Sequence, residues 1–404
     1  MKQLYNLFAL FFVAAMLWNC SDDSNFGVAA PEEAVVTKSF AQDDGSQDLS
    51  QRTTGYIAYK LLSTAGPDVG RSLADVNITD EQYAEIKEFT DKLVEGCTTD
   101  AEVHSTVFNW VSNSIDYTWS DNDPYPVFKN KKGICQGYAN LLKVMLHTQG
   151  VPCVLTNGYM QVNLGHAWCY AYFDKTWYVS DPTNNRYYKA IQYKTAGSDY
   201  NPRSLSAVLF EDEYCTYTYN EGALNVQSIK EGCESVSVPF SAGGFVVSSL
   251  NPAKVHESVK ELYVGANITS FGEGIVGLSI YSAVEKIIID PENKNFESFS
   301  AAVYDKNISG NNLVLVAPGA KHLELKAIEV FDKECKLKDL PNIETMTFVP
   351  GTKRIDAWAV ERCPKLHTVF MPQETVVNSS SFTGVAGSFN IIRGNFTNIP
   401  QIKY

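Results

Sequence analysis

The sequence lacks the features by which metal-binding, disulfide-rich and nucleic-acid-binding proteins are recognised. Nine cysteines are present, but they show no CxxC or metal-ligand spacing, so neither a zinc site nor a full disulfide framework is predicted. No acidic cluster has the spacing of an EF-hand loop, so no calcium site is predicted. Acidic residues exceed basic ones and give a net charge of −13, which disfavours binding to phosphate backbones or anionic lipid. We therefore expect no metal, no cofactor and no nucleic-acid partner.

Long apolar runs are also lacking, apart from a single run near the beginning, residues 7–18. This run is too short to span a bilayer comfortably and follows Lys2, as in a secretory signal peptide. The ending Leu17-Trp18-Asn19-Cys20 resembles the lipobox of bacterial lipoproteins, and Ser21-Asp22-Asp23 resembles the acidic segment of lipoproteins sent to the outer surface. The resemblance implies acylation of Cys20, and an ordinary signal peptide is the alternative. We expect a protein anchored to the outer membrane or cell surface by lipid alone.

The length and composition predict two globular domains behind a tether. A chain of 404 residues with 45% hydrophobic and 20% charged residues is longer than one core usually fills. Residues 21–54 are rich in Ser, Asp, Gln and Ala, which is typical of a flexible linker. We predict a signal segment at 1–20, a tether at 21–54, a first domain at 55–232 and a second at 233–404.

The first domain has the pattern of an α+β fold. Apolar residues recur every three or four positions from Tyr83 to Leu93 and from Val103 to Val111, which predicts two amphipathic helices, the second capped by Thr99 or Asp100. A third helix is predicted to begin at Cys135 and to end at Gly150. The segments that follow, 153–156, 167–173 and 177–179, are rich in β-branched and aromatic residues and predict antiparallel strands.

The second domain contains a degenerate repeat. The segment 343–350 recurs at 366–372, an offset of 22 to 23 residues, and looser copies stand at 262–264 and 284–289. Such a period predicts a solenoid in which each unit covers its neighbour. The set resembles the leucine-rich repeats of bacterial surface antigens of the BspA type, and 295–319 looks like the longer hairpin-bearing unit of that family. A plain β-sandwich is the alternative, because regularly spaced strands also suggest that fold.

Cys135 is the residue with the strongest signal for chemistry. A thiol is a useful nucleophile as thiolate, and a position at a helix N-terminus favours the anion. Activation also needs a base and a group that orients the base. The chain has six histidines; His147 lies on the helix that Cys135 begins, so the helix rise carries it away from the sulfur. His166 and Asp181 flank successive strands, and an antiparallel hairpin would bring both to one edge.

A buried cysteine and a structural histidine would give the same residues without chemistry, so the local context decides. The segments 132–139, 165–168 and 177–183 read KGICQGYA, GHAW and WYVSDPT. Together they resemble, in order, the three core motifs of the transglutaminase-like superfamily.

The resemblance covers about residues 80–200 and implies a papain-like core, with helices packed on an antiparallel sheet, inside the domain 55–232. It implies that Cys135 attacks a carbonyl, His166 transfers the proton and Asp181 orients the imidazole. It also suggests Tyr125, which matches an upstream aromatic of the family, as an oxyanion or substrate-shaping residue. Gln136 and Trp168 are weaker candidates for the same role, and we expect Trp168 mainly to pack under the hairpin.

The expected function is acyl transfer from a peptide or protein amide through a Cys135 thioester outside the cell. Water would make the reaction hydrolysis, an amine would make it crosslinking, and both stay open. The repeats are expected to hold a protein or matrix ligand, and a monomer is expected by default. The alternatives are a catalytically silent surface protein that binds through its repeats and, third, a purely structural outer-membrane protein.

Overall fold

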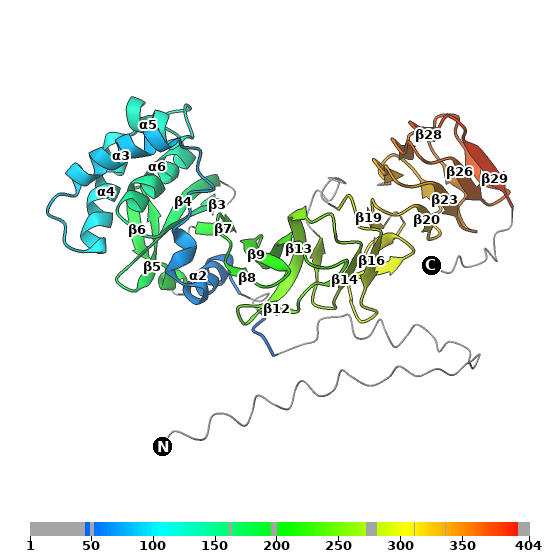
Figure 1. The fold of residues 1–404 in the computed structure, drawn as a ribbon, viewed down its shortest axis with the longest axis horizontal. Coiled ribbons are helices and arrows are strands. Elements are labelled where there is room, and N and C mark those ends of the chain that lie inside the picture. Colours follow the sequence, from blue (N-terminus) through cyan, green and yellow to red (C-terminus); the bar gives the residue numbers. More distant parts are fainter. Residues whose placement is uncertain are drawn as a thin grey trace, which may run out of the picture. The chain divides into compact units, whose positions relative to one another are not determined.

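The computed structural model describes residues 45–48, 52–160, 164–194, 200–271, 281–310, 312–335 and 337–394. The predicted signal segment with Cys20, and most of the predicted tether 21–54, lie outside the described residues. Along the described chain, helices come first and strands follow (Figure 1). Over these ranges, no helix has the length and apolar character needed to cross a membrane.

Five α-helices and a 3₁₀ turn make up the beginning of the described chain. They are α2 (Thr54–Ala65), η1 (Pro67–Gly70), α3 (Asp80–Leu93), α4 (Asp100–Ser114), α5 (Pro124–Asn130) and α6 (Cys135–Thr148). The two predicted amphipathic helices are confirmed as α3 and α4, each of which begins with a capping box. Thr79 pairs with Gln82, and Thr99 with Glu102, so that backbone N–H groups left open by the helix are satisfied.

Two short strands lie between these helices, β1 (Asp116–Tyr117) and β2 (Lys132–Gly133), and pair with each other in a separate parallel sheet. The strands that follow α6 form a mainly antiparallel sheet against which α6 packs. They are β3 (Cys153–Met160), β4 (Leu164–Phe173), β5 (Thr176–Asp181), β6 (Arg186–Lys189), β7 (Tyr200–Leu205), β8 (Phe210–Glu211), β9 (Cys215–Asn220) and β10 (Ala223–Ile229), with η2 (Ala190–Lys194) between β6 and β7. In the sheet, β3 lies between β4 and β7, and β4 continues to β5 and β6. Figure 1 shows α3 to α6 gathered on one face of these strands. The predicted α+β class is confirmed.

The rest of the described chain consists of short strands. They are β11 (Ser235–Ser237), β12 (Ser241–Ala242), β13 (Phe245–Val255), β14 (Glu261–Val264), β15 (Ser270–Phe271), β16 (Lys286–Ile289), β17 (Phe296–Phe299), β18 (Ala302–Asp305), β19 (Leu313–Val316), β20 (His322–Leu325), β21 (Val330–Phe331), β22 (Leu337–Lys338), β23 (Thr345–Phe348), β24 (Arg354–Ile355), β25 (Val360–Glu361), β26 (Thr368–Met371), β27 (Val376–Val377), β28 (Phe382–Thr383) and β29 (Asn390–Arg393). They occupy the segment in which repeats were predicted.

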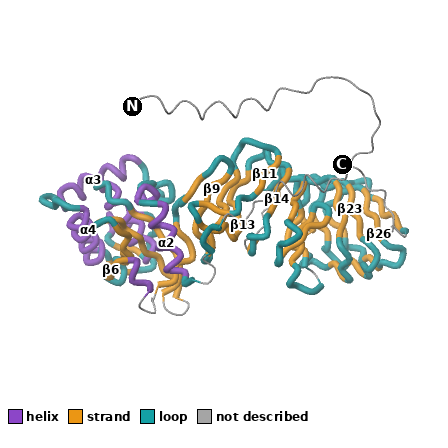
Figure 2. The backbone as a smooth tube through the Cα atoms, turned by 90° about the horizontal axis from the view of Figure 1, so that it is seen from below, coloured by secondary structure: helices purple, strands orange, loops and turns teal. Residues whose placement is uncertain are grey.

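These strands form the predicted solenoid. Strands β20, β23, β26 and β29 pair in parallel, with His322 opposite Thr345, Thr345 opposite Thr368 and Thr368 opposite Asn390, so each coil advances the chain by 22 or 23 residues. Figure 2 shows β23 and β26 as neighbouring strands of this sheet. Two further parallel sheets, β21-β24-β27 and β22-β25-β28, repeat at offsets of 22 to 24 residues. Parallel pairing one coil later distinguishes this architecture from a β-sandwich, which was the alternative. The segment expected to carry a hairpin unit forms the antiparallel sheet β17-β18-β19.

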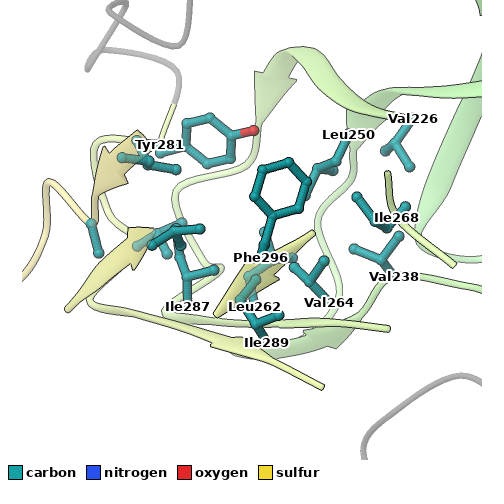
Figure 3. Packing of buried hydrophobic residues seen from close by; sticks show 14 of the residues in the cluster. Val226, Val238, Leu250, Leu262, Val264, Ile268, Tyr281, Ile287, Ile289 and Phe296 are labelled. Carbon is teal, nitrogen blue, oxygen red and sulfur yellow. The ribbon is translucent and has the colours of Figure 1, made fainter. Parts of the chain in front are cut away.

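The buried side chains of the first coils form one hydrophobic core with those of the strands that precede them. Leu262 on β14 lies opposite Ile287 on β16, so two of the looser sequence copies are neighbours in a parallel sheet. Figure 3 shows Leu262, Val264 and Ile287 among the buried side chains of this interior, together with Val226 of β10. Strand β10 pairs with β9 on one side and with β13 on the other. Hydrogen-bonded strands therefore cross the position 232/233, and the domain ranges stay predictions.

The eight described cysteines are all reduced. Five are buried, and three are partly exposed, among them Cys135 and Cys233. Cysteine in a core behaves as a small apolar residue, so the buried thiols need no function beyond packing.

Candidate active site

Cys135 is the first residue of α6, and the strand and loop that precede the helix fix its position. Strand β2 pairs in parallel with β1, which places Tyr117 opposite Gly133. A Cβ atom on Gly137 would lie 2.7 Å from the carbonyl oxygen of Asp121, so only glycine allows this close approach to the first turn of α6. No side chain caps the helix, and the backbone N–H of Gln136 donates to the sulfur. The helix terminus thus stabilises negative charge on the sulfur.

The β-hairpin β4-β5 brings the histidine and the aspartate together. Cys169 lies opposite Ser180, so Trp168 and Asp181 are the next pair, and side chains alternate between faces along a strand. His166, two residues before Trp168, therefore shares the face of Asp181. The imidazole Nε2 lies 2.9 Å from Oδ2 of Asp181, which leaves Nδ1 as the ring nitrogen for the thiol.

The Asp181 carboxylate is completely buried and fully hydrogen-bonded. Its Oδ2 accepts from the Tyr200 hydroxyl at 2.6 Å and from Nδ2 of Asn184 at 2.7 Å, in addition to His166. Its Oδ1 accepts from the backbone N–H groups of Thr183 at 3.1 Å and Asn184 at 3.3 Å. A buried carboxylate is stable as an anion only with such partners, so the site is built to keep Asp181 charged and fixed.

The pKa values of the site favour a thiolate–imidazolium pair. Burial raises the pKa of the Cys135 thiol, but hydrogen bonds with the His166 side chain and from the backbone N–H of Ala167 outweigh it, so the pKa lies below the ordinary cysteine value. Burial lowers the pKa of His166, but hydrogen bonds with Asp181 and Cys135 outweigh that effect and raise it to about 9. For Asp181, hydrogen bonds with His166 and Tyr200 outweigh burial and lower the pKa. The two shifts have opposite directions, so both favour the thiolate–imidazolium pair over the neutral thiol and imidazole.

A cavity of about 320 Å³ gives access to the pair. Its described lining residues come from α6, β3, β4 and β7 and are Cys135, Gln136, Asn157, Gly158, Tyr159, Gly165, His166, Ala167 and Arg203. A volume at the lower end of the range for ligand sites suits one or two side chains of a larger substrate.

The three residues expected to bind the oxyanion or to shape the substrate site lie in different places. Gln136 lines the cavity, and its side chain donates to Asn140. Trp168 is buried and stacks beside His166 with a centroid distance of 5.9 Å, so it supports the imidazole from within the core. The Tyr125 hydroxyl donates to Glu85 at 2.7 Å, so the structure does not bring it to the sulfur.

Three residues that the sequence analysis did not single out complete the site. Tyr117 is the upstream aromatic whose hydroxyl contacts Cys135, and the pairing of β1 with the strand before the cysteine was the signal for it. Asn184 follows Asp181 within the same turn, where an Asx residue is a common partner of a carboxylate or backbone group. Tyr200 comes from β7 and had no local signal.

His104 is a second buried histidine near the site. Its Nε2 lies 2.5 Å from the hydroxyl of Ser180, and its ring stacks on Phe173 with a centroid distance of 4.5 Å. Burial lowers the pKa of His104 to about 3, so the ring is neutral at physiological pH. It therefore supports the strand that carries Asp181. Among the residues that the structure describes, no group of three or more His, Cys, Asp or Glu side chains is placed to hold a metal ion.

The segment that holds Cys135, His166 and Asp181 is similar to a known protein family. Residues 87–182 match the model of the transglutaminase-like superfamily. No curated protein matches the sequence.

Among solved structures, a candidate cysteine protease from Cytophaga hutchinsonii is 16% identical over 30% of this chain and 50% of that chain, with a TM-score of 0.24. The periplasmic domain of TgpA from Pseudomonas aeruginosa is 17% identical over 31% of this chain and 50% of that chain, with a TM-score of 0.26. A leucine-rich cell surface protein from Faecalibacterium prausnitzii is 13% identical over 49% and 52%, with a TM-score of 0.23. The chain spans about half the length of each of these proteins.

Proposed function

We propose that this chain, whose residues 87–182 form a transglutaminase-like domain, is a thiol acyl-transfer enzyme that acts on peptide or protein amides outside the cell. The observation that carries the proposal is the hydrogen-bonded series Cys135–His166–Asp181 beside an open cavity. A buried structural cysteine has no need of an imidazolium partner or of access to solvent.

The geometry supports the following reaction. The Cys135 thiolate attacks the amide carbonyl carbon, and the C=O electron pair moves to oxygen. As the tetrahedral intermediate collapses, the C–N bond breaks and the His166 imidazolium gives its proton to the leaving nitrogen, which leaves a thioester. The now neutral His166 then takes a proton from water or from an amine, which attacks the thioester and releases the thiolate.

Two donors are assigned to the negative charge that would develop on the carbonyl oxygen. The backbone N–H of Cys135 belongs to the first turn of α6, and the hydroxyl of Tyr117 forms hydrogen bonds with the side chain and the backbone of Cys135. Preorganised donors of this kind are often the largest single contribution to acyl-transfer catalysis.

Replacing Tyr117 tests the oxyanion assignment. We expect Tyr117→Phe to lower kcat about 10- to 100-fold with little change in KM, because the hydroxyl would bind charge that exists only in the transition state. Tyr125→Phe is the matched control, since that hydroxyl donates to Glu85, and it should keep near-normal kcat. Equal kcat in the Tyr117 variant and the parent chain would remove Tyr117 from the mechanism.

The location of the enzyme is part of the proposal. The apolar run 7–18 and the lipobox-like sequence that ends at Cys20 support export and lipid attachment at the outer membrane or cell surface. The parallel solenoid supports a role in holding a protein or matrix ligand, because stacked repeats offer extended faces for recognition.

One assay separates the outcomes of acyl transfer. The chain with Cys20→Ser, which lacks the predicted lipid site, would be incubated with dimethylcasein and monodansylcadaverine in ¹⁸O water and the products read by mass spectrometry. Cleaved peptides with ¹⁸O termini indicate a peptidase, ¹⁸O at former glutamines indicates a deamidase, and dansyl adducts indicate a transglutaminase. Product formation no greater than with Cys135→Ala would contradict the enzyme and favour a surface protein that binds through its repeats.

A further inference from the structure

Arg203 supplies a cationic group to the cavity that also exposes the thiol. It is the only Lys or Arg among the described lining residues, and these residues contain no carboxylate. Cys135 and His166 carry opposite charges that cancel, so the remaining formal charge of the lining is positive. The whole chain, in contrast, has a net charge of −13. Arg203 therefore carries the one formal charge that is not balanced within the described lining, and its ion-pair partner Glu221 is not among the lining residues.

The backbone directs Arg203 to this position. Strand β7 pairs with β3 so that Ser204 lies opposite Asn157 and Pro202 opposite Gly158, which makes Arg203 the extra residue of a β-bulge. A bulge turns the side chain of the extra residue away from the regular alternation of the strand. In this case the bulge points the guanidinium along the wall of the cavity, where Arg203 is found.

Two neighbours hold the guanidinium still. Its Nη1 donates to the Tyr159 hydroxyl at 2.9 Å, and its carbon lies 5.3 Å from the centroid of the same ring. Its Nη2 pairs with the carboxylate of Glu221. Glu221 is fixed in turn, because its backbone N–H donates to the carbonyl of Arg203. These contacts use two of the five N–H donors of the guanidinium, and a planar fork fixed in this way is suited to bind a carboxylate.

We propose that Arg203, with Tyr159, forms a subsite that selects acyl donors carrying a carboxylate close to the reacting amide. The subsite rests on the proposed function, because it names the substrate class of the same thiol. An aspartyl or glutamyl side chain, or a terminal carboxylate, next to the scissile amide has the chemistry that this subsite recognises. Glu221 competes for the same charge and so sets how strongly the subsite attracts an acid.

The test uses two alkylating reagents that differ by one charged group. N-iodoacetyl-aspartate α-amide and N-iodoacetyl-asparagine α-amide would be reacted with the chain carrying Cys20→Ser at low ionic strength, and labelling of Cys135 would be followed by peptide mass mapping. We expect the aspartate reagent to react about three- to tenfold faster, and the ratio to fall as salt is added. Arg203→Met should bring the ratio to about one, and Glu221→Gln should raise it about two- to threefold.

Lys230→Met is the matched control. Lys230 also pairs with a surface carboxylate, Glu211 at 2.9 Å, but does not line the cavity, so its replacement should leave the ratio unchanged. A ratio that is the same in the parent chain, Arg203→Met and Glu221→Gln would overturn the subsite. Should Arg203→Met fail to fold, the rise expected in Glu221→Gln still decides.

The outcome is separable from that of the proposed function. Activation of the thiol is measured by the absolute labelling rate with neutral iodoacetamide. The subsite is measured by the ratio of the labelling rates with the aspartate and asparagine reagents. A slow, ordinary thiol with an intact aspartate preference would sink the enzyme and keep the anion site. A fast thiol without that preference would do the reverse.

Discussion

The Asp181→Asn variant is expected to lose about 10²- to 10⁴-fold in kcat/KM while remaining folded. The carboxylate accepts from Nε2 of His166 and raises the pKa of that ring. An amide carries no charge, so the pKa of His166 should fall and the imidazolium should no longer be held beside the thiolate. The amide oxygen can still accept the backbone N–H groups of Thr183 and Asn184, which preserves the turn.

A remote carboxylate with similar partners provides the control. Asp212 accepts the Tyr217 hydroxyl and the backbone N–H groups of Tyr214 and Cys215. Asp212→Asn therefore removes a comparable charge without touching the cavity, and its kcat/KM should stay within about twofold of the parent chain. Equal losses in both variants would mean that Asp181 acts only through the stability of the fold.

The Phe348→Ala variant is expected to lower the free energy of unfolding by about 3–5 kcal/mol. Phe348 on β23 is fully buried, and its ring meets Phe331 edge to face with a centroid distance of 4.9 Å. Because each coil of a solenoid is stabilised mainly by its neighbours, a cavity at this position weakens two interfaces at once. Urea titration followed by fluorescence and circular dichroism would measure the loss.

Val376→Ala is the control for the solenoid. Val376 lies on β27 and is 62% exposed, so its truncation should change the free energy of unfolding by no more than about 0.5 kcal/mol. A loss below about 1 kcal/mol in Phe348→Ala would show that the coils do not depend on this packing.

Local patterns predicted the elements that carry the site. Cys135 stands at the first position of α6 because the apolar spacing of 138–146 marks a helix and the glycines before and after the cysteine allow the approach of the preceding loop. The hairpin β4-β5 followed from alternating aromatic residues around a turn, and it places His166 on the face of Asp181. Both features depend on residues close in sequence.

Features that depend on the pairing of distant strands could not be predicted. Tyr200 reaches Asp181 because β7 pairs with β3, a choice that no residue near Asp181 reveals. Motif spacing suggested Tyr125 as the upstream aromatic, but the pairing of β1 with β2 places Tyr117 beside the cysteine. The bulge that directs Arg203 depends on the same long-range register.

The solenoid shows a similar division. The offset of 22 to 23 residues between 343–350 and 366–372 predicted the number of residues in one coil, because equivalent residues of a parallel stack lie opposite each other. The join to the preceding sheet was not visible in the sequence. It depends on β13, whose residues pair with β10 through an irregular register.

The most direct test of the central claim is the rate at which iodoacetamide labels Cys135 between pH 4 and 10, in the chain carrying Cys20→Ser and with His166→Ala beside it. The pKa of Cys135 is lowered and that of His166 is raised to about 9. The ion pair therefore forms when rising pH deprotonates the Cys135 thiol, and it is lost when further rising pH deprotonates the His166 imidazolium. We predict a plateau of fast labelling that begins below the free-thiol pKa of about 8.5 and extends to about pH 9. Cys233, whose pKa is raised by burial, serves as the internal control. In His166→Ala the plateau should vanish, because the hydrogen bond and the charge of His166 no longer offset burial, and only the backbone N–H groups of Ala167 and Gln136 still lower the pKa of Cys135. A single ordinary titration of Cys135, unchanged by His166→Ala, would contradict the account.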